Sequence, residues 1–270
     1  MTTTQRVAIV TGGMGGLGEA ICMKLARMGI KVVVTYSPSN TKSEQWLKEM
    51  AARDYHFHAY PADVADYDSC AATIAKIQKE IGPIDILINN AGISMRALLK
   101  DMDVEVIQKV MDVNFYGTVY CTKLALEAVI KSKGTIAGIS SIAGYRGLPG
   151  RSGYSASKFA INGWLESIRT ELQDTGVNVM WVCPGFTASN IRSVALDKEG
   201  KLHGESPMDE SQLMSAEECA RHILNAIEKR KRTLVLTFKG KQTVWLNKLF
   251  PGWADKLVKK FFFKNGELVK

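Results

Sequence analysis

The sequence predicts an α/β fold: one doubly wound parallel sheet of about seven strands, with helices on both faces and a helical tail at the carboxyl end. The first observation behind this prediction is an alternation along the chain. Short apolar or β-branched runs alternate with segments whose apolar residues recur every three or four positions. The second observation is that the 270 residues, 46% hydrophobic and 23% charged, suffice for one large core. We therefore expect residues 1–270 to form a single domain.

The first half of the chain supplies four strands and three helices. The predicted strands, each an apolar run that ends in turn residues, are 6–13, 31–37, 56–64 and 84–92. The predicted helices between them are 18–29, 43–54 and 68–82. Strands separated by helices of this length indicate right-handed βαβ units, in which the strands are parallel.

The second half continues the alternation. It predicts a long helix over 103–131, a strand over 134–141, a helix over 152–175, a strand over 177–185 and a last strand over 232–238. A helix should begin near Ser215, because Ser215 and Glu218 fit a capping box. The polar segment 186–214 follows the carboxyl end of a strand, where ligands bind in such sheets. We expect it to form a lid over the substrate; the alternative is a plain surface loop.

The positive charge of the chain is concentrated in one segment. The whole chain carries +8, yet residues 229–264 alone hold eleven Lys or Arg and one Asp, a net +10, so the remainder sums to −2. Basicity confined to one tail, without a nucleic-acid-binding motif beside it, argues against a nucleic-acid partner.

The basic tail, residues 239–270, has an amphipathic pattern. Its apolar residues at helical spacing are Leu246, Leu249, Phe250, Trp253, Leu257 and Phe261, and its lysines on other faces are Lys248, Lys256, Lys259, Lys260 and Lys264. Pro251 and Gly252 should split it into two short helices. The interpretation we favour is that the apolar face packs over the substrate cleft or against another subunit. The second interpretation is peripheral contact with an anionic membrane surface.

Cysteine and histidine patterns predict no metal site. The five cysteines are widely spaced with no Cys-x-x-Cys pair, which favours free thiols in a reducing compartment. His56 and His58 alternate with Phe57 and Tyr60, so they should lie on the solvent face of a strand. No apolar run reaches the roughly 18 residues of a membrane span, and we expect no signal peptide, because a predicted strand follows the first residues at once. We expect a cytoplasmic protein.

A glycine-rich turn follows the first strand and opens a helix in TGGMGGLGEAI. Gly12, Gly16 and Gly18 would allow a tight turn, a close approach to a pyrophosphate and close packing of helix on sheet. The free N–H groups at the start of the helix would face the phosphates. The strand–turn–helix context makes dinucleotide binding the expected function of this turn.

The end of the second strand should select the cofactor. An acidic residue there would bind the ribose 2′-hydroxyl of NAD, but VVVTYSPSNTKSEQ has no acid before Glu44. Ser37 and Asn40 can donate hydrogen bonds to a 2′-phosphate, and Lys42 supplies positive charge. NADP(H) is therefore favoured, with NAD(H) as the alternative.

Hydrogen-bonding residues stand at the carboxyl ends of several predicted strands, which meet at one edge of the sheet. They are Asp63, the NNAG segment 89–92, Ser141 and the CPGFTAS segment 183–189. Tyr154 and Lys158 lie on one face of the following helix, since they are four residues apart. Asn114 lies within the long helix 103–131.

Taken together, TG-x3-G-x-G, NNAG, the helical Asn, Ser141, Tyr-x3-Lys and Pro-Gly occur in the order and spacing of the short-chain dehydrogenase/reductase family, which residues 6–190 resemble. The resemblance implies a Rossmann-type fold of seven strands and reversible hydride transfer between a nicotinamide and a ketone/alcohol pair. It also implies a homodimer or homotetramer formed through the helices 103–131 and 152–175. The cofactor-binding residues expected from it are Gly12, Gly15, Gly16, Leu17, Gly18, Tyr36, Ser37, Asn40, Lys42, Asp63, Val64, Asn90, Ala91, Gly92, Tyr154, Lys158, Pro184, Gly185 and Thr187.

The chemistry of ketone reduction assigns a role to each of four residues. Hydride arrives at carbon and a proton at oxygen, and Tyr154 would supply that proton as the general acid/base. An unperturbed phenol has a pKa near 10, so the Lys158 ammonium would stabilise its anion and also hold the ribose hydroxyls. Ser141 would hydrogen-bond the substrate oxygen, and Asn114 would hold a water that links Lys158 to solvent.

The resemblance differs between the two parts of the chain. Residues 1–92 look like acetoacetyl-CoA reductases, and residues 93–270 look like another bacterial branch of the family, which admits a mosaic or chimeric chain. We expect an NADP(H)-dependent reductase of an apolar or acyl-like ketone. One alternative is an acetoacetyl-CoA (3-oxoacyl-CoA) reductase. An alternative of another class is a non-catalytic NADP(H)-binding protein that docks on membranes or partners through its tail.

Overall fold

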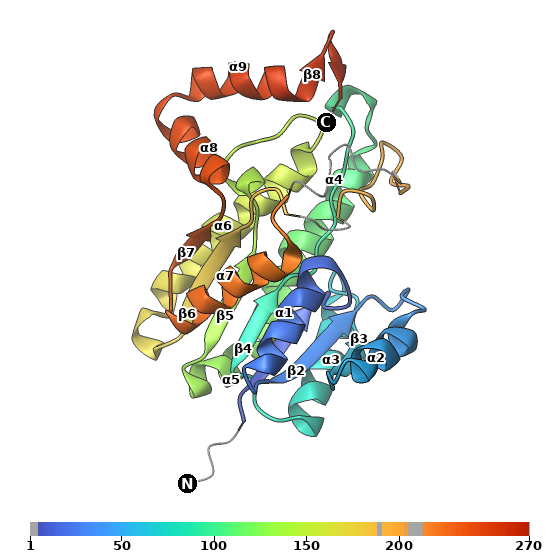
Figure 1. Ribbon diagram of the computed structural model, residues 1–270, viewed down its shortest axis with the longest axis vertical. Coiled ribbons are helices and arrows are strands. Elements are labelled where there is room, and N and C mark those ends of the chain that lie inside the picture. Colours follow the sequence, from blue (N-terminus) through green and yellow to red (C-terminus); the bar gives the residue numbers. More distant parts are fainter. Residues whose placement is uncertain (1–4, 188–190, 203, 205–212, 270) are drawn as a thin grey trace.

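Seven parallel strands form one sheet in the computed structural model, which describes residues 5–187, 191–202, 204 and 213–269 (Figure 1). The strands are β1 Val7–Thr11, β2 Lys31–Tyr36, β3 His58–Pro61, β4 Ile86–Asn89, β5 Thr135–Ile139, β6 Asn178–Cys183 and β7 Thr233–Val235. Their order is β3-β2-β1-β4-β5-β6-β7, and every pairing is parallel. The chain thus switches direction across the sheet between β1 and β4, the point at which such sheets bind ligands. The predicted fold class is confirmed.

Helices cover both faces of this sheet. They are α1 Gly16–Arg27, α2 Ser43–Ala52, α3 Tyr67–Glu80, α4 Val104–Met111, α5 Gly117–Ser132, α6 Ser152–Glu171 and α7 Ala216–Glu228, followed in the tail by α8 Phe238–Leu249 and α9 Pro251–Phe262. Along β1, Ala8 and Val10 face the core under α1, α2 and α7, whereas Val7 and Ile9 face the core under α3, α5 and α6. Successive side chains of a strand point to opposite faces, so a strand buried on both faces is apolar throughout.

The predicted helix 103–131 contains a π-helical turn. The turn, Asp112–Tyr116, joins α4 to α5 and holds Asn114 at its centre with none of its surface exposed. The Asn114 side chain bonds to the loop after β4 and to α6, and these contacts lie far away in sequence. Apolar periodicity therefore cannot reveal such a turn. Widened turns of this kind inside helices are frequent at functional sites.

The structure confirms the predicted start of α7 but shows a shorter last strand than predicted. Ser215 caps α7 as predicted, because its Oγ accepts a hydrogen bond from the Glu218 N–H at 3.0 Å. The strand expected over 232–238 is only Thr233–Val235. Thr237 instead caps α8, with its hydroxyl accepting a bond from the Gly240 N–H at 3.0 Å, so Phe238 opens a helix.

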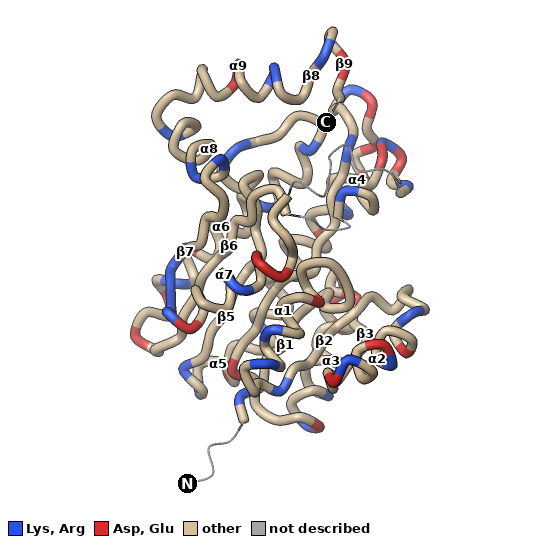
Figure 2. Tube along the Cα trace, in the orientation of Figure 1, with Lys and Arg blue, Asp and Glu red and all other residues tan. Residues whose placement is uncertain are grey.

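The tail consists of two helices at the end of the molecule that lies beyond the carboxyl ends of the strands (Figure 1). The split between α8 and α9 falls at Pro251, as predicted. A short antiparallel hairpin, β8 Phe263–Lys264 and β9 Glu267–Leu268, follows and was not expected. Figure 2 shows lysines along both tail helices. None of the described helices combines the length and apolar character that crossing a bilayer requires.

Candidate active site

A cavity of about 1620 Å³ opens at the carboxyl ends of the strands. The glycine turn, the end of β2, the loops after β3, β4 and β6, the start of α6 and the tail helices all contribute to its wall. All of the predicted cofactor-binding residues line this cavity except Asn40 and Lys42. Ser141 also lines the cavity, whereas Asn114 is fully buried and does not line it.

The glycine turn is packed so closely that side chains would collide there. A Cβ on Gly18 would lie 2.5 Å from the Gly12 carbonyl oxygen and 2.7 Å from Asn90 Nδ2. A Cβ on Gly15 would meet nothing within 4 Å, because this part of the turn is open. α1 begins here without a side-chain cap, so its first N–H groups are available to an anion. The turn thus fits the pyrophosphate of a dinucleotide.

Asn90 braces this turn from the loop after β4. Its Nδ2 donates to the carbonyl oxygens of Thr11, at 2.9 Å, and Gly12, at 3.0 Å. The Thr11 hydroxyl accepts bonds from the N–H groups of Asn90 and Ala91, each at 3.0 Å. These four bonds fix the two loops that would hold the cofactor against each other.

Two serine hydroxyls face the cavity at the end of β2. Ser37 Oγ and Ser39 Oγ lie 2.8 Å apart, and both residues line the cavity. Asn40 is turned away: its Nδ2 donates to Met14 Sδ at 3.7 Å and its Oδ1 accepts from the Lys42 N–H at 2.8 Å. Ser39 was not predicted, although the spacing Ser-x-Ser in the sequence could have indicated it.

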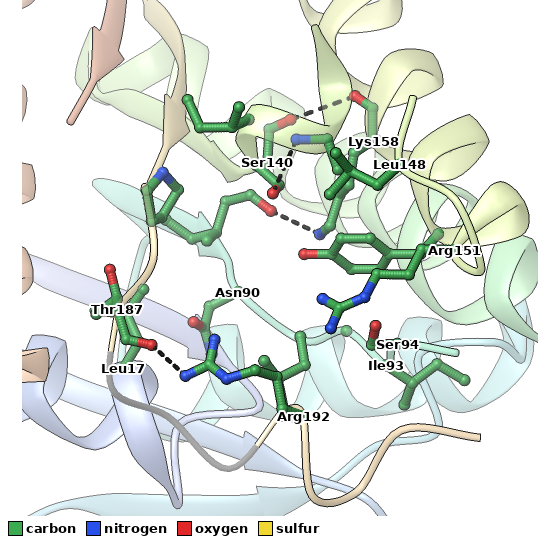
Figure 3. A pocket seen from close by; sticks show the side chains of 18 of the residues that line it. Leu17, Asn90, Ile93, Ser94, Ser140, Leu148, Arg151, Lys158, Thr187 and Arg192 are labelled. Atoms are coloured by element: carbon green, nitrogen blue, oxygen red, sulfur yellow. Dashed lines mark hydrogen bonds between the residues drawn. The ribbon is translucent and has the colours of Figure 1, made fainter. Parts of the chain in front are cut away.

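Tyr154 and Lys158 share one buried face of α6. Tyr154 is 8% exposed and Lys158 is 3% exposed, and Lys158 Nζ lies 5.5 Å from the centre of the Tyr154 ring. The ammonium donates one hydrogen bond, 2.8 Å long, to the Ile139 carbonyl oxygen at the end of β5 (Figure 3). An ammonium has three N–H donors, so two remain for a ligand in the cavity.

Burial acts on the pKa values of both groups. It lowers the pKa of Lys158 to about 8, because burial removes water from the charged ammonium group. It raises the pKa of Tyr154 above its ordinary value; a hydrogen bond with Ser141 and the positive charges of Arg151 and Arg192 partly offset this rise. Tyr154 is therefore a protonated phenol at neutral pH in the free protein.

Ser141 and Asn114 are both held in place by backbone contacts. Ser141 Oγ accepts a bond from the Ala143 N–H at 3.1 Å beside Tyr154. The Asn114 side chain accepts from the Ile93 N–H at 2.8 Å and donates to the Ile93 carbonyl at 3.0 Å and to Ser157 Oγ at 2.9 Å. Asn114 thus fastens the loop after β4 to α6, and its expected role in holding a water stays a prediction.

Three polar residues that the sequence reasoning missed line the same cavity: Ser94, Arg151 and Arg192. In Figure 3 the Arg151 guanidinium group lies beside Ser94, and the Arg192 guanidinium group is directed toward Thr187. Arg151 directly precedes α6 and stands only three residues before Tyr154 in the sequence, which could have indicated it. Arg192 comes from the predicted lid, of which residues 188–190, 203 and 205–212 lie outside the described residues.

The tail packs over this cavity, as the first of the two interpretations predicts. Trp245, Leu246, Leu257, Phe261 and Phe262 contribute to the wall. Other apolar tail residues face solvent, among them Trp253 with 71% of its surface exposed. Contact of these residues with a membrane surface stays a prediction.

Arg146, in the loop after β5, ties both tail helices to the domain. Its Nη1 donates to Asn247 Oδ1 in α8 at 2.8 Å, and its Nη2 donates to Asp255 Oδ1 in α9 at 2.6 Å. Asn247 in turn donates to the Tyr145 carbonyl at 2.9 Å. Arg146 is 14% exposed and Asp255 is 69% exposed, so solvent screens the ion pair in part.

Arg146→Ala is expected to loosen the tail by about 1–2 kcal/mol, because the bonds to both helices are lost. Amide hydrogen exchange in residues 238–262 should become roughly tenfold faster, while exchange in the sheet stays unchanged. Arg221→Ala, on the exposed surface of α7, is the matched control. Unchanged exchange in the tail would contradict this assignment.

Comparison with families of known proteins gives one match over most of the chain. The model of the short chain dehydrogenase family matches residues 6–200. The solved structure of an alcohol dehydrogenase from the archaeon Thermococcus sibiricus, complexed with 5-hydroxy-NADP, has the same fold. It superposes with a TM-score of 0.72 at 22% identity over 86% of this chain and 96% of that one.

Curated relatives are similar over most of their length. The acetoacetyl-CoA reductase of Cupriavidus necator is 37% identical over 200 residues, 72% of this chain and 81% of that protein. The dehydrogenase/reductase SDR family member 7B of Mus musculus is 34% identical over 253 residues, 91% of this chain and 78% of that protein. The 3-oxoacyl-[acyl-carrier-protein] reductase of Synechocystis is 39% identical over 189 residues, 70% of this chain and 76% of that protein. Similarity to the acetoacetyl-CoA reductase therefore extends beyond the first 92 residues.

Proposed function

The chain belongs to the short-chain dehydrogenase family of oxidoreductases, and on that premise we propose that it uses NADP(H) to reduce a ketone to a secondary alcohol. The observation that carries the proposal is the buried pair of Tyr154 and Lys158 on the same cavity as the glycine turn. Hydride transfer to a carbonyl requires a proton donor and a nucleotide-binding site within one cavity.

Each residue of the site would have its own role in ketone reduction. The glycine turn and the start of α1 hold the pyrophosphate, and two N–H donors of Lys158 hold the ribose. The reduced nicotinamide of a bound cofactor would supply the hydride. Ser141 donates a hydrogen bond to the ketone oxygen and positions it beside the phenol. Tyr154 then gives its proton to that oxygen, and the Lys158 ammonium lowers the cost of the resulting phenolate.

A burial-raised pKa of Tyr154 suits the reductive direction. A phenol that keeps its proton at neutral pH can act as the acid without prior protonation. The reverse reaction needs the phenolate, which the nearby positive charges of Lys158, Arg151 and Arg192 would stabilise. In the reduction, Tyr154 therefore acts as the acid from its resting protonation state.

The proposed activity is tested by following NADPH consumption with acetoacetyl-CoA and with a panel of bulky apolar ketones. Turnover of any of them supports the proposal. Rapid turnover of acetoacetyl-CoA would favour the second candidate, a 3-oxoacyl-CoA reductase, which the 37% identity to an acetoacetyl-CoA reductase supports. Binding of NADPH without turnover of any ketone would favour the non-catalytic alternative. The presence of all four residues Asn114, Ser141, Tyr154 and Lys158 argues against that alternative.

Ser37→Asp is expected to reverse the cofactor preference. A carboxylate at the end of β2 would repel a 2′-phosphate and accept a hydrogen bond from a 2′-hydroxyl. The ratio of kcat/KM for NADPH to that for NADH should fall by about a hundredfold. Ser37→Ala, which removes the hydroxyl without adding charge, should change this ratio only a few-fold. A ratio that stays constant in Ser37→Asp would place the 2′-phosphate elsewhere.

We also propose a homo-oligomer formed through the helices α4, α5 and α6. Tyr116, between α4 and α5, is 44% exposed, and Phe159 on α6 is 46% exposed. Large apolar side chains exposed on neighbouring helices are typical of subunit interfaces.

A further inference from the structure

Arg151 is a cation with no hydrogen-bond or ion-pair partner among the residues that the structure describes. Its Nε is buried, and no described residue forms a hydrogen bond or ion pair with its guanidinium group. The charged groups that act on it are the Tyr154 phenol and two further arginines, Arg192 and Arg96. Burial lowers the pKa of Arg151 in these surroundings. Buried charges in proteins are normally paired, so this cation lacks the anion that would compensate for its lost hydration.

A second polar group without a hydrogen-bond partner among the described residues, the Ser94 hydroxyl, lies in the same cavity as Arg151. Ser94 is 2% exposed, lines the cavity, and its hydroxyl has no hydrogen-bond partner among the described residues. Arg192, 6% exposed, lines the same cavity, acts on the charge of Arg151 and donates to the Thr187 carbonyl at 2.7 Å (Figure 3). Forked guanidinium donors and a hydroxyl donor around one space match the geometry of a carboxylate.

The position of Arg151 fixes where such an anion would lie. Arg151 is the residue that directly precedes α6, and its guanidinium group lies close enough to the Tyr154 phenol for each group to act on the pKa of the other. The nucleotide phosphates would lie at the glycine turn, at the start of α1, and not beside the reacting phenol. An anion on Arg151 therefore belongs to the substrate.

We propose that Arg151, with Ser94 and Arg192, binds a carboxylate of the substrate, which would make the substrate an oxo acid whose carboxylate lies a few bonds from its ketone. This inference rests on the proposed function only in placing the ketone at Tyr154. The rest of the substrate should be apolar, because Ile93, Leu148 and Ile191 line this part of the cavity. The chemical class is an oxo acid with a hydrocarbon chain.

Binding of hexanoate and of its neutral isostere hexanamide tests the site without any turnover. Isothermal titration calorimetry is performed on the full chain, with and without NADP⁺. Hexanoate should bind roughly tenfold to a hundredfold more tightly than hexanamide, as expected for charge-assisted hydrogen bonds. Arg151→Met keeps most of the length of the side chain, removes the charge, and should abolish this difference. Arg221→Met, which removes an exposed arginine of α7, should retain it.

Two further measurements separate this role from a structural one. Arg151 is partly buried and its Nε has no hydrogen-bond partner among the described residues, which destabilises the free protein, so Arg151→Met should raise its Tm by roughly a few degrees. The ratio of kcat/KM for an oxo acid to that for its methyl ester should fall roughly tenfold or more in Arg151→Met, and only in part in Arg151→Lys, which keeps the charge but not the fork.

Equal affinity for hexanoate and hexanamide in the unmodified protein would overturn the inference, and so would an unchanged preference in Arg151→Met. An equal loss of activity on the oxo acid and its ester would also overturn it, since Arg151 would then act only on Tyr154. A preference for hexanoate in a protein that reduces no ketone would leave the anion site standing and refute the proposed function alone.

Discussion

Replacing Tyr154 with phenylalanine is expected to lower kcat for ketone reduction about a thousandfold, with NADPH affinity within a few-fold of the original. Tyr154 belongs to a small hydrophobic core that includes Met95 and Ala143, so phenylalanine preserves the packing. What is lost is the hydroxyl that donates the proton. Steady-state rates and a fluorescence titration with NADPH measure the two quantities separately.

Tyr120→Phe serves as the matched control, because Tyr120 lies on α5 and does not line the cavity. It should retain its activity. If Tyr154→Phe kept most of its kcat, another group would have to supply the proton, and the mechanism would be wrong. A large loss of NADPH affinity would instead mean that Tyr154 acts chiefly in cofactor binding.

Replacing Lys158 with methionine is expected to lower kcat/KM by about two orders of magnitude while making the free protein more stable. Burial lowers the pKa of this amine from 10.5 to about 8. At neutral pH the folded protein therefore carries a desolvation penalty of about 3 kcal/mol, which methionine does not have. The lost hydrogen bond to Ile139 reduces the expected gain to about 1–3 kcal/mol.

The pH dependence of this stability difference has a definite sign. Between pH 8 and 10.5 the unfolded chain keeps the Lys158 proton and the folded chain releases it, so the free energy of unfolding of the original protein rises with pH. The advantage of Lys158→Met should thus be complete below pH 8 and should shrink as pH approaches 10.5. Urea unfolding at pH 7 and pH 10 measures it, with Lys131→Met on the exposed surface of α5 as the control. A less stable Lys158→Met at pH 7 would show that the amine stabilises the fold.

Much of the fold can be read from local patterns in the sequence. The alternation of apolar strands and amphipathic helices predicts the parallel sheet, because a strand buried on both faces needs a continuous apolar run. The break between α8 and α9 follows from Pro251, whose ring cannot continue a helix. The glycine turn and the pair of Tyr154 and Lys158 are also local features, and the structure brings them to one cavity.

The features that the sequence could not reveal depend on contacts between distant segments. Arg146 meets Asn247 across 101 residues of chain, and no periodicity records such a contact. The π-helical turn at Asn114 is tied to bonds with Ile93 and Ser157. Asn40 has the right residue type for a phosphate contact, but its side chain turns toward Met14. In each case the position of a side chain depends on neighbours that only the folded chain supplies.

The most direct test of the central claim is to follow the hydride itself. The protein is incubated with each ketone of the panel and with NADPH carrying deuterium at one of the two C4 positions of the nicotinamide, in separate reactions for each label. Mass spectrometry of the product should find one deuterium on the carbinol carbon from one label and none from the other. Alcohol without deuterium from either label, or no alcohol from any ketone in the presence of bound NADPH, would contradict hydride transfer in this cavity.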